Sequence, residues 1–260
     1  MAGRPVRPLL VLQHIACEPP AAYEDELRAW GGDVHRVEID EGEPLPDWRE
    51  FAGIIAMGGP MGAYEDGRLP WLAPEKRLIG DAVRSGAPVW GVCLGAQLLA
   101  AALGAEVFAG PRAEVGILPV TTTAGAAADP VFCQAPPEFA ALQWHGDTFA
   151  LPPGARHLAS SAAYPHQAFA VQRAYGLQFH LEIGGDSATG WGAVPAYAQS
   201  LRDLLGADAL PRLVDALRER EADMIRLARR LFAAWLEHVV GWPPPASARS
   251  ADPARDAQPL

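Results

Sequence analysis

The stretch PVWGVCLGAQLLAAALG, residues 88–104, places a cysteine between two glycines where a strand-like apolar run meets a helix-like one. This pattern predicts a nucleophile elbow of the form G-x-C-x-G, made by Gly91, Cys93 and Gly95. The residue at the tip of so tight a turn has a strained backbone, and a Cβ on either flanking position would collide with the adjoining strand or helix. The alternative interpretation is a buried cysteine in an ordinary strand–helix unit.

The elbow places Cys93 at the N-terminus of a helix expected over residues 94–103. A helix N-terminus carries partial positive charge and unpaired N–H groups, which favour a thiolate over a thiol. The N–H of Leu94 is then available to an oxyanion that develops next to the sulfur. These features together predict a thiol nucleophile.

A second pattern lies far downstream, in AYGLQFHLE, residues 174–182. Alternation over residues 175–181 predicts a strand, in which His180 and Glu182 project from the same face. A thiol nucleophile needs a base beside it, and the base needs an acceptor that fixes its tautomer. Cys93, His180 and Glu182 supply these three groups. Taken alone, His180 would equally fit a solvated strand end.

Three blocks in order resemble the class I, or triad-type, glutamine amidotransferases: MGGPMGAYED at residues 57–66, GVCLGAQLLA at 91–100 and GLQFHLE at 176–182. The segment QWHGDTFALP, residues 143–152, is most similar to free-standing GMP-synthase-like amidotransferases. The resemblance implies an α/β fold of flavodoxin-like type. Such a fold is an open, mostly parallel twisted sheet with helices on both faces, here with a small antiparallel extension.

The resemblance also implies a role for each residue of the triad. Cys93 would attack the side-chain amide carbon of glutamine and form a γ-glutamyl thioester, with release of ammonia. His180 would protonate the leaving nitrogen and then activate the water that hydrolyses the thioester, while Glu182 orients it. No cofactor and no metal are implied.

Further residues are assigned to the substrate by the same resemblance. The backbone N–H groups of Gly59 and Leu94 would form the oxyanion hole, and the α-substituents of glutamine would meet Gln97, His145, Gly146 and Asp147. Without the family, Gln97 reads as a helix residue facing water, and residues 145–147 read as a surface turn. Glycines on both sides of the Gly58–Gly59 peptide leave it free to rotate. We therefore expect slow hydrolysis of glutamine unless a partner or a larger γ-glutamyl substrate is present to order this turn.

Outside the elbow, apolar runs of strand type alternate with segments of helix type, which predicts a parallel sheet covered on both faces. Strands are expected at residues 9–15, 33–39, 51–57 and 88–92, and helices at residues 23–30, 71–85, 94–103, 193–205 and 210–239. Residues 105–183 predict short strands and turns, as in an antiparallel extension. The sequence Gly184-Gly185-Asp186-Ser187 resembles the pyrophosphate loop of a synthetase domain, but we expect a glycine-rich loop at the rim of the site.

Composition supports this interpretation. The chain has 260 residues, half of them hydrophobic, and these are enough for the core of one domain over residues 1–242; residues 243–260 read as a disordered tail. A net charge of −10 without a basic cluster argues against nucleic acid as a partner. No apolar run is long enough for a membrane helix. Three widely spaced cysteines indicate a reducing, cytoplasmic location.

Three functions remain open from the sequence. The first is a glutaminase that delivers ammonia to an acceptor or to a separate synthase subunit. The second is a γ-glutamyl peptidase or hydrolase that uses the same triad on larger γ-glutamyl amides. The third, a non-catalytic binding protein on this fold, would require a broken triad.

Overall fold

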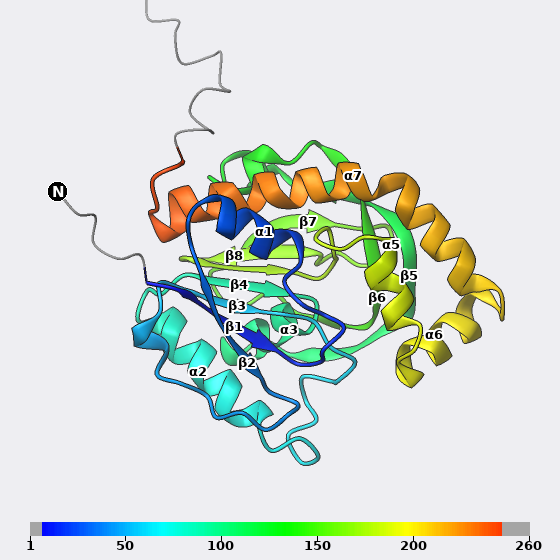
Figure 1. Cartoon of the computed structure of the whole chain (residues 1–260), viewed down its shortest axis with the longest axis horizontal. Coiled ribbons are helices and arrows are strands. Elements are labelled where there is room, and N and C mark those ends of the chain that lie inside the picture. Colours follow the sequence, from blue (N-terminus) through cyan, green and yellow to red (C-terminus); the bar gives the residue numbers. More distant parts are fainter. Residues whose placement is uncertain (1–6, 246–260) are drawn as a thin grey trace, which may run out of the picture.

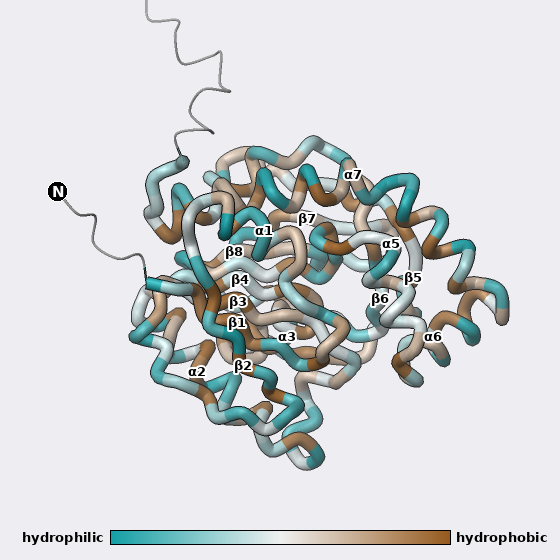
Figure 2. The backbone as a smooth tube through the Cα atoms, viewed as in Figure 1, coloured by the Kyte–Doolittle hydropathy of each residue, from teal (hydrophilic) through white to brown (hydrophobic). Residues whose placement is uncertain are grey.

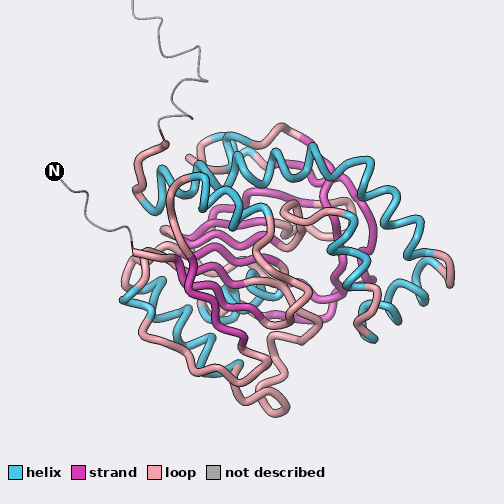
Figure 3. Tube along the Cα trace, in the orientation of Figure 1, coloured by secondary structure: helices cyan, strands magenta, loops and turns pink. Residues whose placement is uncertain are grey.

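The computed structural model describes residues 7–245, and over this range the strands form one nine-stranded sheet of order β2-β1-β3-β4-β9-β8-β7-β5-β6 (Figure 1). The strands are β1 (Leu9–Gln13), β2 (Val34–Glu38), β3 (Ile54–Ala56), β4 (Val89–Val92), β5 (Val107–Thr122), β6 (Glu138–Phe149), β7 (Arg156–Ser160), β8 (Ala168–Val171) and β9 (Ala174–Leu177). Figure 3 shows the strands as a central layer with helices on either side.

The sheet has a parallel half and an antiparallel half. Neighbours from β2 through β9 pair in parallel, and neighbours from β9 through β6 pair antiparallel. The predicted α/β fold with an antiparallel extension is confirmed. The expectation of short strands over residues 105–183 is wrong for β5 and β6, which pair along most of their length with a register shift between Ala109 and Glu114.

Helices flank the sheet as α1 (Ala22–Ala29), α2 (Leu72–Arg84), α3 (Leu94–Ala102), α4 (Ala124–Ala127), α5 (Gly185–Trp191), α6 (Pro195–Leu205) and α7 (Ala209–Trp235), with 3-10 turns at Trp48–Glu50 and Phe132–Gln134 and a π-helical turn at Leu236–Val240. The expected helices are therefore present, with ends shifted by a few residues. The glycines at 184–185 correct one expectation, because Gly185 begins α5 rather than lying in a loop.

Strand alternation produces two cores. Leu9 and Val11 belong to one apolar cluster together with residues of α1 and α7, whereas Leu10 and Leu12 belong to a second cluster with residues of α2 and α3. Since successive side chains of a strand point to opposite faces, a strand buried on both faces must be apolar throughout. Figure 2 shows that apolar residues follow one another along β1. It also shows apolar and polar residues alternating along α7, whose apolar side faces the sheet.

The structure describes only the beginning of the expected disordered tail. Residues 246–260 lie outside the described residues, and residues 243–245 have no regular secondary structure.

No helix within residues 7–245 has the length and apolar character needed to cross a bilayer.

The parallel register brings the functional segments together. Ala56 of β3 pairs with Gly91 of β4, so both strands end at the same edge of the sheet. The turn that begins at Gly58 and the elbow at Cys93 therefore lie side by side. Ligands of open α/β sheets bind at this carboxyl edge.

Candidate active site

The elbow has the backbone that its sequence predicts. Cys93 joins β4 to α3 with a φ of 52°, a left-handed backbone value that residues other than glycine rarely adopt. A Cβ on Gly91 would lie 2.6 Å from the carbonyl oxygen of Gly95, and a Cβ on Gly95 would overlap the carbonyl oxygen of Ala56. Both glycines are thus required by backbone packing.

His180 and Glu182 form a buried pair. The Nδ1 atom of His180 lies 2.7 Å from Oε1 of Glu182, and both side chains are 1% exposed. Strand β9 ends at Leu177, before the expected end at residue 181, but His180 keeps an antiparallel bridge to Leu142 with N···O distances of 2.9 and 3.0 Å. The backbone N–H of Leu181 donates to the second Glu182 oxygen at 2.9 Å, which fixes the carboxylate.

The surroundings of His180 favour its charged form. Burial opposes the charge, but the Glu182 carboxylate and a hydrogen bond with Cys93 outweigh it, so the pKa of His180 lies well above its ordinary value. The ring of Trp191 packs edge-on against the imidazole, with 4.7 Å between centroids. The imidazole is thus held in an enclosed setting near the thiol.

A pocket of about 240 Å³ opens beside the thiol. Its lining includes these predicted site residues: Gly59, Cys93, Gln97, His145, Gly146 and Asp147. Leu94, His180 and Glu182 are almost fully buried and lie outside this lining. The predicted nucleophile therefore faces the pocket, and the predicted base and its acceptor are enclosed behind it.

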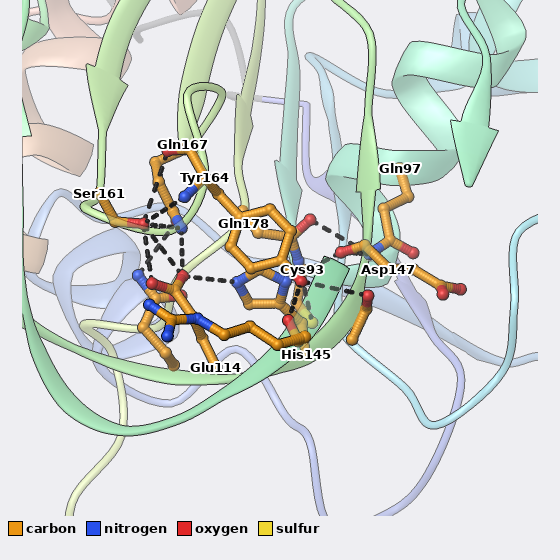
Figure 4. Close-up of polar contacts among 12 residues, drawn as sticks. Cys93, Gln97, Glu114, His145, Asp147, Ser161, Tyr164, Gln167 and Gln178 are labelled. Atoms are coloured by element: carbon orange, nitrogen blue, oxygen red, sulfur yellow. Dashed lines mark hydrogen bonds and ion pairs between the residues drawn. The ribbon is translucent and has the colours of Figure 1, made fainter. Parts of the chain in front are cut away.

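Gln97 does not face water. Its side chain is buried and donates to Oε1 of Gln178 at 3.1 Å and to the carbonyl oxygen of Asp147 at 3.5 Å (Figure 4). The amide of Gln178 in turn donates to the Cys93 sulfur at 3.7 Å. Gln97 thus links the helix that carries the nucleophile to the pocket wall formed by β6.

His145 belongs to a buried network rather than to a surface turn. Its Nδ1 donates to the carbonyl oxygen of Asp147 at 2.8 Å, and its Nε2 lies 3.4 Å from Glu114 (Figure 4). Ser161 and Gln167 each donate to Glu114 at 2.8 Å. Burial alone would raise the pKa of Glu114, but His145 and these donors outweigh it and hold the pKa below its ordinary value.

Glu114 was not predicted from the sequence. The only indication there is that an acidic residue stands in a strand-like segment, directly before VGILPV.

A second group that the sequence did not indicate lies near His180. Tyr197 of α6 donates to Oε1 of the buried Glu18, whose other oxygen has no hydrogen-bond partner among residues 7–245. Burial raises the pKa of Glu18 even though His180 opposes that shift. Tyr197 also lines the pocket, as does Ser200, which accepts from Trp144 at 3.0 Å. Helix α6 therefore forms one side of the pocket.

Two backbone donors near the thiol are free. Neither the N–H of Leu94 nor that of Gly59 donates to an acceptor within the described part of the chain. Gly59 lies against Leu94, since a Cβ on Gly59 would be 3.1 Å from the Leu94 side chain. Such unpaired donors beside a nucleophile can bind an oxyanion.

The other two cysteines have surroundings that differ from those of Cys93. Burial, with Glu18 nearby, raises the pKa of Cys17 to about 11, and Cys133 is exposed on a 3-10 turn. Over residues 7–245, no group of three or more His, Cys, Asp or Glu side chains could hold a metal ion.

Comparison with known proteins places these features in a family. The sequence model of the family described as glutamine amidotransferase class-I matches residues 22–188. GMP synthase (glutamine-hydrolyzing) of Thermomicrobium roseum is 42% identical over 132 residues, which make up 50% of this chain but only 23% of that longer protein. The glutamine amidotransferase-like protein YfeJ of Salmonella typhimurium is 30% identical over 187 residues, covering 68% of this chain and 76% of YfeJ.

Solved structures of glutamine amidotransferases have a similar fold. A glutamine amidotransferase from Thermotoga maritima superposes with a TM-score of 0.80 at 31% identity, covering 91% of this chain and 99% of that chain. A glutamine amido transferase from Methylobacillus flagellatus gives the same TM-score and identity, covering 93% and 97%.

Proposed function

Because the chain belongs to the class-I glutamine amidotransferase family, we propose that it hydrolyses the side-chain amide of glutamine through a thioester on Cys93. One observation carries the proposal. The thiol stands on a strained elbow at the wall of a small pocket, close enough to a buried imidazole–carboxylate pair to raise the pKa of the imidazole. Nucleophile, base and orienting acid are the three parts that such a reaction needs.

The reaction begins with the Cys93 sulfur attacking the amide carbon of glutamine. The carbonyl oxygen becomes an oxyanion, which the N–H groups of Leu94 and Gly59 stabilise. His180 takes the thiol proton as the sulfur attacks and gives it to the amide nitrogen, the C–N bond breaks and ammonia leaves. Water then attacks the thioester while His180 takes a proton from it. The C–S bond breaks, His180 returns that proton to the sulfur, and glutamate and the free thiol result. Glu182 holds the imidazole in one orientation through its Nδ1 atom.

Pocket size supports an amino acid as the acyl donor. A volume of about 240 Å³ lies below the ~300–1,000 Å³ typical of sites for larger small molecules. Gln97, His145 and Asp147 would meet the α-amino and α-carboxylate groups, because they line this pocket beside the thiol. A longer γ-glutamyl peptide would have to extend past α6.

The ammonia would pass to an acceptor or to a separate synthase subunit. The name of the relatives called GMP synthase (glutamine-hydrolyzing) joins glutamine hydrolysis to a synthase in those proteins. We place the protein in the cytoplasm, where its three thiols would stay reduced.

A substrate panel tests the proposal. Ammonia or amine release is measured with glutamine and with a γ-glutamyl dipeptide, for the wild type, for Cys93→Ser, and for Cys133→Ser as a matched control. We expect glutamine turnover that is lost only in Cys93→Ser. Preference for the dipeptide would favour the γ-glutamyl peptidase, and substrate binding without turnover would favour the binding protein.

A further inference from the structure

A buried histidine and a buried glutamate, which take no direct part in the proposed reaction, lie next to the turn formed by Gly58 and Gly59. His14 follows β1, Glu75 belongs to α2, and the side chains of both are 0% exposed. The Nε2 atom of His14 lies 2.9 Å from Oε1 of Glu75, and the Nδ1 atom lies 3.3 Å from the carbonyl oxygen of Gly58. Trp71 stacks on the imidazole, with 5.7 Å between ring centroids.

The sheet register explains how these groups meet. Leu12 of β1 pairs with Ala56 of β3, so His14 and Gly58, each two residues farther on, leave the sheet side by side. Glu75 reaches the same point from the first turn of α2. The pairing thus joins three segments that are far apart in the sequence.

Hydrogen-bond chemistry fixes the position of one proton. A carbonyl oxygen only accepts, so the Nδ1 atom of His14 must donate to Gly58. The Nε2 atom faces a carboxyl oxygen, and one proton lies between them. Burial disfavours a charged imidazole, but the Glu75 carboxylate raises the pKa of His14, which supports a ring that donates at both nitrogens.

Peptide geometry transmits this contact to the pocket. The carbonyl of Gly58 and the N–H of Gly59 belong to one planar peptide, and the structure has no cis peptide bond within residues 7–245. In a trans peptide these two groups point in opposite directions. A donor that fixes the carbonyl on the His14 side therefore fixes the N–H on the opposite side.

The preceding peptide is fixed as well. The N–H of Met57 donates to Leu12 at 3.0 Å, and the carbonyl of Met57 accepts from the N–H of Gly95 at 3.0 Å. The turn is thus tied to β1 and to the elbow immediately before the glycines. Gly59 itself has no room to shift, since a Cβ there would lie 3.1 Å from the Cβ of His14.

We propose that His14, held by Glu75, is a positioning residue that aims the N–H of Gly59 at the oxyanion formed on Cys93. This inference rests on the proposed hydrolysis of a γ-glutamyl amide. It also changes an expectation from the sequence, in which the two glycines leave this peptide free until a partner orders it. A contact within the chain supplies that order, so hydrolysis of glutamine does not depend on a partner.

The test compares three variants that differ in the donor. His14→Leu removes the donor, and His14→Asn keeps an amide near the position of Nδ1. The double variant His14→Leu/Glu75→Leu removes the donor without leaving a buried carboxylate unpaired. Loss of one oxyanion donor lowers kcat by about 10²- to 10³-fold. We expect His14→Leu and the double variant to lose about 10²-fold in kcat with KM within about twofold, and His14→Asn to recover at least about tenfold of that loss.

Two further readouts separate positioning from damage. Alkylation of Cys93 by iodoacetamide needs the thiolate but no oxyanion hole, so its rate should match the wild type in all variants. Crystal structures of the wild type and of His14→Leu should show the Gly58 carbonyl turned only in the variant. An unchanged carbonyl direction, or kcat within about twofold of the wild type in the double variant, overturns the inference. A wild type that releases no ammonia or amine from glutamine or a γ-glutamyl dipeptide refutes the proposed function, and the carbonyl direction still decides the role of His14.

Discussion

Replacing Cys93 by glycine should give a more stable protein than replacing it by alanine. Both Cys93→Gly and Cys93→Ala remove the thiol, so they differ only in the Cβ and in backbone freedom. Cys93 has a φ of 52°, and a non-glycine residue held in such a conformation costs of the order of 1–3 kcal/mol. Glycine escapes this cost but loses about 0.5–1 kcal/mol more on folding, because its unfolded chain is more flexible. The expected difference is about 1 kcal/mol in favour of Cys93→Gly.

Equilibrium unfolding in urea measures this difference. The free energies of unfolding of the two variants are compared at equal slope against denaturant, so that the midpoints report stability alone. Ala222→Gly serves as a control, since Ala222 is exposed on α7 with helical backbone, and glycine there should lose about 1 kcal/mol. Opposite signs at the two positions would support a strained elbow. If Cys93→Gly is the less stable of the pair, the reasoning on the elbow is refuted.

Other expectations concern the base and the packing of the elbow. His180→Ala should lower kcat more than Glu182→Gln does, because the histidine moves protons while the acid orients it; equal losses in steady-state assays would contradict this. Since the pKa of His180 is raised in the folded state, its contribution to stability is complete below the unfolded value of 6.5 and is lost as pH rises through the folded value. The stability gap between the wild type and His180→Ala, from urea unfolding at several pH values, should therefore shrink at alkaline pH, and a gap that grows would be inconsistent with a raised pKa. Gly95→Ala should cost about 3 kcal/mol or more through overlap with the Ala56 carbonyl, whereas Gly146→Ala, whose Cβ would have 3.8 Å of space, should cost little; similar losses in thermal unfolding would disprove the packing argument.

The shape of the elbow and the contact between His180 and Glu182 could be predicted because their requirements are local. Gly91 and Gly95 flank Cys93 within five residues, and each is needed by the backbone next to it. His180 and Glu182 are two residues apart and meet at 2.7 Å, even though β9 ends before them. Because these two residues are so close in the sequence, their side chains meet although the predicted strand ends before them.

The supporting groups could not be predicted in the same way. His14 and Glu75 are 61 residues apart, and Glu18 and Tyr197 are 179 residues apart, so no periodicity connects them. Each pair forms because β1 lies inside the parallel half, between β2 and β3, and segments from α2 and α6 reach the residues that follow it. A polar residue immediately after a buried strand, such as His14, was the one available signal.

The length of β5 and β6 was missed for another reason. Their polar residues are spread along both faces, and Glu114 is buried inside the sheet against Ser161 and Gln167 rather than facing solvent. Alternation of hydropathy is therefore weak in these strands, and Gly116 and Pro119 suggest turns where the chain remains extended.

Mass spectrometry of the protein quenched in acid during incubation with glutamine tests directly whether the acyl group passes through Cys93. Cys133 is exposed and Cys93 is buried, so accessibility alone would direct modification to Cys133. We expect a γ-glutamyl thioester on Cys93. It should be absent from Cys17 and Cys133 and absent from the Cys93→Ser variant. A γ-glutamyl adduct on Cys17 or Cys133, with Cys93 unmodified during turnover, would contradict it.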